Sequence, residues 1–424
     1  MIEAVLQRDN LNQAYRKVVS NAGGSGVDGV TIHDLHHYAH AHKAEALHAI
    51  RNRNYIPKPI RGVEIPKSNG KKRLLGIPTC FDRLLQQALT QVLTPLYEPE
   101  FLDTSYGFRP GKNAHDAVHK SLEYLHSGKT YVVDIDLKSF FDEVSHEMIL
   151  QLLYKKVKCD STLLLIKRYL RAPIQINGRL HKRRRGLPQG GPLSPLLSNI
   201  LLHELDKELT SRRLNFVRYA DDFSIYVSSK EAAKRVGNGI YLYLKYKLKL
   251  RINRVKSGIR RPKDFKMLGY GFVPLYKKGV KGRYQLVVDV SKWKVLKQQL
   301  KYWTRKTQPL SFDERIIRLR KLTVGWLNYF KYANMSIRLK KLDHWLRNRL
   351  RYCIWHDWKK PERKRKNLIR LGISPDQAYA WSRTNMGGWR VAQSPILITT
   401  ITLNRLKQRG YQPLQELHAA MKLG

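Results

Sequence analysis

The spacing of apolar and polar residues changes along the chain and predicts two kinds of structure. Residues 1–290 mix short runs rich in β-branched and aromatic residues with longer runs of helical period. The strand-like runs are YVVDIDL (131–137), FVRYADDFSIYV (216–227) and RYQLVVDV (283–290), and two of the helical segments are 113–125 and 194–209. This mixture predicts an α+β domain.

The helix predicted over 194–209 has a recognisable start and one apolar face. Ser194 is the expected N-cap, and Pro195 follows in the first turn, where proline is tolerated. The apolar face consists of Leu196, Leu197, Ile200, Leu201, Leu205 and Leu209.

Beyond residue 290 the pattern becomes helical and basic. All eight tryptophans lie between Trp293 and Trp389. Residues 291–370 contain 24 lysines and arginines against 5 acidic residues, a net charge of +19, with apolar positions spaced by three and four. After residue 370 basic residues become less frequent. Turn-forming residues beside a β-branched run over 386–402 indicate a small C-terminal region. The predicted domains are therefore 1–290, 291–365 and 366–424.

The amino-acid composition indicates that the protein binds a polyanion. The 424 residues include 80 Lys+Arg and 33 Asp+Glu, a formal charge of +47, which favours RNA or DNA as partner. No apolar run of 18 residues exists and the start, MIEAVLQRDN, lacks a signal-peptide core, so we expect a soluble cytoplasmic protein without a membrane partner. Cys80, Cys159 and Cys353 are far apart, which argues against disulfides and a zinc ribbon.

Motif patterns then narrow the function class. The chain contains neither G-x-x-x-x-G-K-[ST] nor G-x-G-x-x-G, so an ATP-driven helicase or a dinucleotide enzyme is disfavoured. His33, His36, His37 and His40 have helical spacing, but no open metal-site pattern accompanies them, and a solvated helix face suits them better. The remaining question is whether the protein only binds nucleic acid or also performs chemistry on it.

Carboxylates on two strand-like runs point to chemistry. Asp221 and Asp222 lie between apolar runs, where a hairpin turn would explain them equally well. Asp134 and Asp136 share one face of the strand predicted over 131–137, and burying them is costly unless a cation neutralises them. Two such strands in one sheet can bring carboxylates to the same edge, which is an arrangement suited to a pair of Mg²⁺ ions.

Several segments together resemble reverse transcriptases, and more closely the intron-encoded reverse transcriptase and maturase proteins of bacterial group II introns. The segments occur in that family's order along nearly the whole chain. They are EIPKSNGKKRLLGIPT (64–79), SYGFRPGKNAHDAV (105–118), DLKSFFD (136–142), GLPQGGPLSPLLSNI (186–200), YADD (219–222), Lys-Ser (256–257) and MLGYGF (267–272). The resemblance implies a right-hand polymerase with a fingers and palm mixed sheet, followed by a helical thumb (maturase domain X) and a small DNA-binding region.

The resemblance also implies residue roles at the catalytic centre. Asp136, Asp221 and Asp222 would be the catalytic carboxylates and the ligands of two Mg²⁺ ions, for which Mn²⁺ could substitute. Asp134 is given a supporting role, with a nearby arginine as its expected partner. Phe141 would lie under the sugar of the incoming nucleotide and reject ribonucleotides, although Phe140 remains an alternative, because adjacent strand residues face opposite ways.

Further residues are implied in nucleotide and template binding. Lys67 and Arg73 bracket a predicted hairpin turn and would hold the triphosphate. Gln189 and Gly190 form a flexible turn that would approach the nucleotide. The implied contacts to template or primer are Arg109, Lys256 and Gly269; Lys256 could also protonate pyrophosphate or be a solvated surface lysine.

The function implied by the resemblance is RNA-directed DNA polymerase activity combined with splicing assistance. Expected partners are group II intron RNA, an RNA template with a DNA primer, target DNA and dNTPs. The alternatives are an RNA-binding maturase that does not polymerise, an RNA-dependent RNA polymerase, and a domesticated reverse transcriptase in DNA repair or defence. The three aspartates argue against the first, and Tyr-Ala-Asp-Asp with a ring at 141 argues against the second. No endonuclease-like cysteine and histidine pattern follows residue 370.

Overall fold

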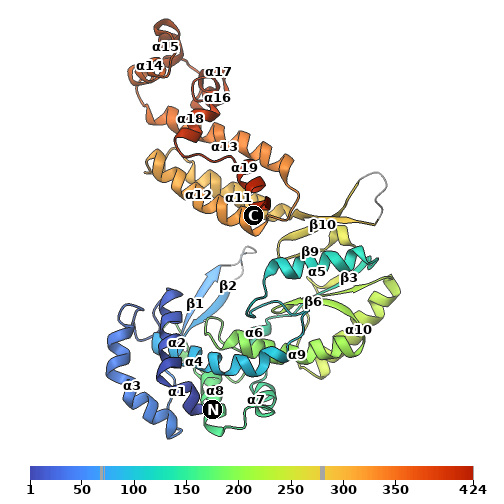
Figure 1. Cartoon of the computed structure of the whole chain (residues 1–424). Helices are drawn as coiled ribbons and strands as arrows, with labels where there is room; N and C mark the ends of the chain where they lie inside the picture. Colours follow the sequence, from blue (N-terminus) through green and yellow to red (C-terminus); the bar gives the residue numbers. More distant parts are fainter. Residues whose placement is uncertain (67–69, 71, 277–281, 424) are drawn as a thin grey trace. The chain divides into compact units, whose positions relative to one another are not determined.

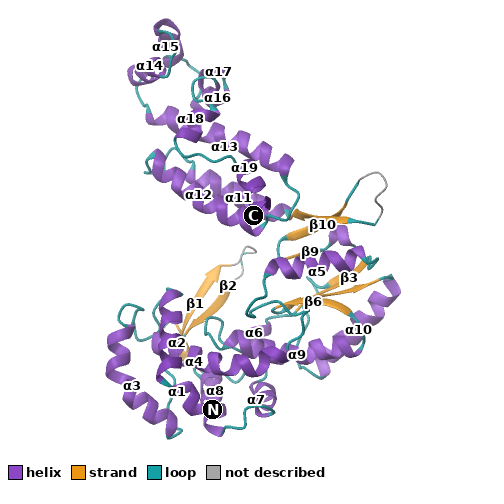
Figure 2. Cartoon of the chain, viewed as in Figure 1, coloured by secondary structure: helices purple, strands orange, loops and turns teal. Residues whose placement is uncertain are grey.

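The chain divides into two compact units, Met1–Phe265 and Lys266–Gly424. The computed structural model describes residues 1–66, 70, 72–276 and 282–423 (Figure 1). The α+β class predicted from the sequence is confirmed, because the first unit combines sheets with helices and the second is mostly helical (Figure 2). The domain boundaries predicted near residues 290 and 365 stay predictions.

The helices of the first unit surround its sheets and supply most of its core. α4 is buried along most of its length, and the Thr79 hydroxyl caps it by accepting a hydrogen bond from the Asp82 backbone N–H. The helices are α1 Ile2–Leu6, α2 Arg8–Ser20, α3 Leu35–Arg51, α4 Cys80–Tyr97, α5 Ala114–His126, α6 Phe140–Glu143, α7 His146–Tyr154, α8 Asp160–Arg171, α9 Ser194–Ser211 and α10 Lys230–Tyr246.

Two sheets form the strand part of the first unit. The first has the order β2-β1-β4-β5, in which β1 and β2 are an antiparallel hairpin and β1 and β4 are parallel. The second has the order β6-β7-β3-β8 and is antiparallel throughout. The strands are β1 Ile60–Pro66, β2 Lys72–Ile77, β3 Tyr131–Asp136, β4 Ile174–Ile176, β5 Arg179–His181, β6 Asn215–Tyr219, β7 Asp222–Val227 and β8 Gly258–Arg260.

The second sheet of the first unit has one face in the core. Val133 and Ile135 of β3 are buried among the helices, so Asp134 and Asp136, which alternate with them, lie on the opposite face. Helix α10 packs on β3 and β7 (Figure 1). The period of two in the sequence therefore fixes which face of β3 carries the acids.

The second unit joins a small sheet to a series of helices. Its strands, in the order β11-β10-β9, are β9 Lys266–Met267, β10 Tyr270–Pro274 and β11 Tyr284–Val288. Its helices are α11 Val290–Trp303, α12 Phe312–Tyr329, α13 Ser336–Asp357, α14 Pro361–Arg370, α15 Pro375–Ser382, α16 Gly388–Gln393, α17 Pro395–Ile398, α18 Leu403–Gln408 and α19 Leu414–Leu423. The helical character predicted for 291–370 is confirmed.

Three local expectations differ from the structure. Leu193, and not Ser194, is the N-cap of α9, and the Ser194 hydroxyl instead donates to the Pro188 carbonyl at 2.6 Å. Phe140 and Phe141 lie in the one-turn helix α6 and not in a strand, so the argument from strand alternation does not apply to them. The β-branched residues near 398–402 lie in and after the short helix α17, where local packing overrides strand propensity.

Candidate active site

The acidic strand and the acidic hairpin meet at one edge of the sheet. β3 and β7 are antiparallel neighbours, and their register pairs Asp136 directly with Asp222. Asp221 lies in the turn that joins β6 to β7, immediately before Asp222. Because directly paired side chains of neighbouring strands lie on one face about 5 Å apart at Cβ, the sheet brings these carboxylates together.

Burial and the neighbouring negative charges disfavour ionisation of the two acids at the turn, Asp221 and Asp222. Burial and the charges of Asp221, Asp136 and Asp134 raise the pKa of Asp222 to about 6. Burial also raises the pKa of Asp221, to which the charge of Asp136 adds, while Arg73 and Lys256 oppose the increase. Asp221 and Asp222 therefore lie where the charged form of a carboxylate is disfavoured, and Lys256 offsets only part of that effect.

A loop after α10 holds Asp136 from several directions. The Asn253 side-chain amide donates to Asp136 Oδ1 at 3.0 Å, and Lys256 Nζ lies 3.0 Å from Asp136 Oδ2. Backbone contacts reinforce these, since the Asn253 N–H donates to the Asp136 carbonyl and the Asp136 N–H donates to the Ser257 hydroxyl. Asp136 is thus fixed by residues that follow it by more than a hundred positions.

A buried ion pair supports the hairpin turn. Arg218 of β6 and Asp206 of α9 are both fully buried, and the guanidinium donates to both carboxylate oxygens, at 2.8 and 2.6 Å. The same guanidinium donates to the Asn199 side-chain oxygen at 3.0 Å and to the Ala220 carbonyl at 3.1 Å. Because Ala220 directly precedes Asp221, this network fixes the turn that presents the acids.

The backbone of the turn is also tightly enclosed. Ala220 has a φ of +56°, in the left-handed region that residues with a Cβ rarely adopt. A Cβ on Gly107 would lie 2.3 Å from the Ala220 nitrogen, and the Gly107 carbonyl accepts a hydrogen bond from Asn199. Gly107 is therefore required for the close approach of its loop to the turn.

Asp134 has the arginine partner expected from the sequence. The Arg260 guanidinium of β8 donates to Asp134 Oδ2 at 2.9 Å, which confirms that prediction. Burial raises the pKa of Asp134, while Arg260 opposes the increase. Asp134 thus carries a structural ion pair beside the three acids.

Two of the predicted nucleotide-binding residues contact each other. The Arg73 guanidinium of β2 donates to the Gln189 side-chain oxygen. Gly190, with a φ of +137°, runs so close to β2 that a Cβ there would lie 2.5 Å from the Gly76 carbonyl oxygen. Lys67 lies outside the described residues.

Phe141 is placed beside the Gln189 loop. Its carbonyl accepts a hydrogen bond from the Leu187 N–H at 2.6 Å, and a Cβ on Gly186 would lie 2.7 Å from the same oxygen. Phe141 keeps 9% of its surface exposed, whereas Phe140 is 2% exposed and packs edge-on against it. Both rings are buried in the core, so the contact of Phe141 with the sugar, with Phe140 as the alternative, stays a prediction.

Arg109 is engaged inside the first unit. Its side chain is 5% exposed and donates to Glu98 and to the carbonyls of Phe101, Leu102 and Ser105. A direct template contact through this guanidinium would require breaking those bonds. The geometry therefore argues against the predicted contact and supports a role in bracing the loop that contains Gly107.

Gly269 belongs to the second unit and has a packing role there. It lies between β9 and β10 with a φ of +86°, and a Cβ would lie 3.0 Å from Lys292 Cε and 3.3 Å from Phe330 Cζ. The turn therefore needs glycine irrespective of any ligand. Its contact with template or primer stays a prediction.

Sequence reasoning missed Arg218, Asp206, Asn199 and Asn253. The only local signals were an arginine inside the apolar run 216–219 and an aspartate on the apolar helix that precedes it. Charged residues in such positions are costly to bury unless they are paired, which could have marked Arg218 and Asp206 as partners.

The carboxylates fit a divalent cation in chemistry. Oxygen ligands suit Mg²⁺, which usually keeps water and substrate oxygens in its shell, and unneutralised negative charge favours a cation. Within the described ranges, no three or more His, Cys, Asp or Glu side chains already converge as a complete metal site. In the same part of the chain, no helix is long and apolar enough to cross a membrane.

Comparisons with known proteins agree with this geometry. Residues 65–272 match the model "Reverse transcriptase (RNA-dependent DNA polymerase)", and residues 293–372 match "Group II intron, maturase-specific domain". Protein YkfC of Escherichia coli K12 is 32% identical over 321 residues, which cover 64% of this chain and 82% of YkfC. The chain therefore belongs to the group II intron reverse transcriptase and maturase family, whose reverse transcriptases use divalent metal ions.

Two further comparisons set the extent of the similarity. Group II intron-encoded protein LtrA of Lactococcus lactis subsp. cremoris is 37% identical over 215 residues, which cover 50% of this chain and 36% of LtrA. The matched part is thus about a third of that relative. Among solved structures, telomerase from Candida albicans is 13% identical with a TM-score of 0.43, covering 80% of this chain and 66% of that one.

Proposed function

We propose that this chain is an RNA-directed DNA polymerase of a group II intron, which copies RNA into DNA by nucleotidyl transfer. The observation that carries this proposal is the pairing of Asp136 with Asp222 on neighbouring strands, with Asp221 in the adjoining turn. The proposed domains are fingers and palm over 1–290, a helical thumb over 291–365 and a DNA-binding region over 366–424.

Asp136, Asp221 and Asp222 would hold two Mg²⁺ ions, for which Mn²⁺ could substitute. When bound, such ions lower the pKa of the primer 3′-hydroxyl and neutralise the leaving pyrophosphate. Asn253 keeps Asp136 in place through its 3.0 Å hydrogen bond. The Lys256 side chain remains 63% exposed beside Asp136, so its ammonium group can turn toward the phosphates or the template strand.

The incoming nucleotide would lie against the second group of residues. Arg73 supplies a guanidinium for the triphosphate, and its hydrogen bond to Gln189 orients it. Gly190 is exposed where it passes β2, so its backbone atoms would be accessible to the nucleotide. Phe141 would exclude a 2′-hydroxyl by occupying its space, and Lys67 is proposed as a second cation for the triphosphate.

The second part of the proposal is splicing assistance. The match of residues 293–372 to a maturase-specific domain supports it, as does the net charge of +19 over 291–370. The proposed partners are group II intron RNA in splicing and retrohoming, an RNA template with a DNA primer, target DNA and dNTPs.

Primer extension tests the polymerase proposal. A DNA primer on an RNA template is extended with dNTPs or NTPs by the unaltered chain and by Asp221→Ala/Asp222→Ala. We expect DNA synthesis from dNTPs and its loss in the double variant. Asp103→Ala, which removes a 94% exposed carboxylate of the same unit, is the control that should retain activity. Failure of the unaltered chain to incorporate dNTPs would reject the proposal, and incorporation of NTPs alone would indicate an RNA polymerase.

Splicing of a precursor RNA separates the two roles. If Asp221→Ala/Asp222→Ala still promotes splicing of a cognate intron RNA, the RNA-folding role does not need the catalytic acids. If the unaltered chain extends primers but promotes no splicing, a reverse transcriptase in repair or defence becomes the better description. If it splices without extending primers, it is a maturase without polymerase activity.

A further inference from the structure

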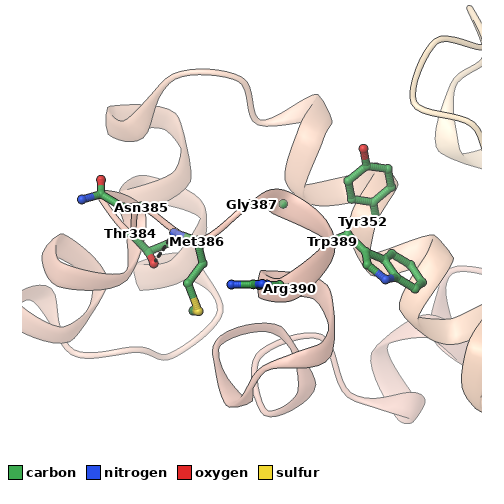
Figure 3. A pocket seen from close by; sticks show the side chains of 8 residues that line it. Tyr352, Thr384, Asn385, Met386, Gly387, Trp389 and Arg390 are labelled. Carbon is green, nitrogen blue, oxygen red and sulfur yellow. Dashed lines mark hydrogen bonds between the residues drawn. The ribbon is translucent and has the colours of Figure 1, made fainter.

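A hollow in the second unit contains none of the residues proposed for catalysis or nucleotide binding. Its volume is about 770 Å³, and it lies between Tyr352 of α13 and the segment 384–390, which leads into α16. Figure 3 shows Thr384, Asn385 and Met386 on one side of Gly387 and the rings of Tyr352 and Trp389 on the other. All of these residues come from one compact unit.

One wall of the hollow is an ordered aromatic pair. The rings of Tyr352 and Trp389 meet edge to face, with centroids 5.9 Å apart. The Arg349 guanidinium lies 5.6 Å from both centroids and is itself fixed by hydrogen bonds to Thr304. Both rings are only partly buried, so part of their surface stays accessible to a planar ligand.

A glycine keeps this wall in place. A Cβ on Gly388 would lie 3.2 Å from Cε2 of Tyr352, so the first turn of α16 packs directly on the ring. Gly387, by contrast, has no atom within 4 Å of the corresponding position and faces open space. The backbone at Gly388 therefore packs against the aromatic wall, whereas the backbone at Gly387 faces solvent.

The charge of the hollow favours an anion. None of its lining residues is acidic. Arg390 and Asn385 are exposed, and neither side chain makes a hydrogen bond or ion pair with another residue in the described part of the chain. Arginine is suited to a phosphate, and an amide can hydrogen-bond the edge of a base.

We propose that this hollow binds one unpaired nucleotide of a single-stranded nucleic acid. The base would lie against Tyr352 and Trp389, and its phosphate would pair with Arg390. A base inside a continuous duplex offers no free face to the rings, so a duplex is disfavoured. RNA and DNA share the base and phosphate chemistry, and the test below separates them. Residues 384–390 lie within the DNA-binding region proposed over 366–424, so this proposal rests on that part of the proposed function. It does not depend on polymerase activity, because it needs neither dNTPs nor divalent ions.

A spectroscopic titration tests the contact directly. The full chain is labelled with 5-fluorotryptophan, and the Trp389 resonance is identified by its loss in Trp389→Phe. Oligo(A), oligo(dA) and a blunt duplex of equal length are then added without divalent ions. We expect the Trp389 resonance to shift with single strands and not with the duplex. A shift with oligo(A) alone identifies RNA as the ligand, and a shift with oligo(dA) alone identifies DNA. A shift with both shows that the hollow does not distinguish the two sugars.

Affinity measurements add a matched pair of variants. Arg390→Ala and Arg370→Ala each remove one exposed charge of the same unit, but only Arg390 lines the hollow. We expect Arg390→Ala to weaken binding of labelled single strands about fivefold more than Arg370→Ala, which corresponds to about 1 kcal/mol. Equal weakening by both variants, or a Trp389 resonance that does not move at saturating single strand, would overturn the proposal. Both substitutions are on the surface, so we expect both variants to fold, and their affinities for single strands can be compared directly.

Discussion

Acidic residues are used in opposite ways by the two units of the chain. At the sheet edge of the first unit, Asp136, Asp221 and Asp222 lie together, and the pKa of Asp222 rises to about 6. In the second unit an acid such as Asp289 is satisfied locally. Burial opposes its ionisation, but hydrogen bonds from Lys266 and Ser291 outweigh that effect and lower its pKa to about 2.

Asp343 is a second acid of the second unit that is held by hydrogen-bond donors of the fold. It is 3% exposed, and its carboxylate accepts hydrogen bonds from the Tyr411 hydroxyl and from the backbone N–H groups of Leu414 and Gln415. These contacts attach the start of α19 to α13. The donors around Asp343 all belong to the fold, whereas Asp136 shares its oxygens with Asn253 and the exposed Lys256, and Asp221 and Asp222 lie beside it with raised pKa values.

The largest expected effect tests the availability of Asp136. Asp136→Asn should reduce primer-extension turnover by about 1000-fold or more, about 4 kcal/mol in activation free energy, because an amide lacks the charge that holds a cation. Steady-state kinetics measure the loss, and the thermal unfolding temperature should change little. Retention of more than about a tenth of the activity, a change of under about 1.4 kcal/mol, would mean that Asp136 is not a cation ligand.

The buried pair beneath the turn should give the largest effect on stability. Arg218→Met leaves Asp206 buried without its partner and should cost about 3–5 kcal/mol in the free energy of unfolding. Urea denaturation measures this cost. The double variant Arg218→Met/Asp206→Leu should recover a large part of the stability but little activity, because the Ala220 carbonyl stays without its donor. Full recovery of activity would show that the pair does not position the turn.

Asp343→Asn should affect stability without affecting chemistry directly. It weakens three charge-assisted hydrogen bonds and should cost about 2 kcal/mol of unfolding free energy. Urea denaturation measures the cost. At temperatures well below unfolding, primer extension should stay within about threefold of normal, under about 0.7 kcal/mol. An activity loss as large as that of Asp136→Asn would remove the distinction between the two acids.

The smallest effect concerns pH. Folding raises the pKa of Asp222 from near 4 in the unfolded chain to about 6. Above about pH 6 its ionised carboxylate therefore destabilises the folded state, and below about pH 4, where it is protonated in both states, it has no effect on stability. Asp222→Asn should therefore stabilise the metal-free protein at pH 8 by about 1 kcal/mol, after allowance for solvent screening of this exposed side chain. The gain should vanish near pH 4, as measured by thermal unfolding at both pH values. Asp103→Asn, on an exposed loop, should show no gain.

The sequence predicted those parts of the site that follow a local period. Alternation along 131–137 places Asp134 and Asp136 on one face, and of the acidic pair Asp221 lies in the turn between two strands while Asp222 begins the second strand. No periodic pattern in the sequence indicated the contacts between distant segments. Arg218 reaches Asp206 across 12 positions and Asn253 reaches Asp136 across 117, and only the fold brings them together.

Two expectations drawn from local motifs did not include the partners that the fold supplies. The resemblance implied a contact of Arg109 with template or primer, whereas in the structure its guanidinium donates to the Glu98 carboxylate and to three backbone carbonyls. Ser194 is a favoured N-cap residue, yet its hydroxyl donates to Pro188 and the helix begins after Leu193. In both cases backbone carbonyls are among the acceptors, and no side-chain pattern reveals them.

The strand order β6-β7-β3-β8 has a consequence for synthesis on the ribosome. β3 is made first, but its partners β7 and β8 begin only at Asp222 and Gly258. Until those segments emerge, both edges of this apolar strand are open to pairing with other chains. Products that end before Asp222 are therefore expected to aggregate, and the three aspartates of the proposed cation site have all been translated only when about half of the chain has been made.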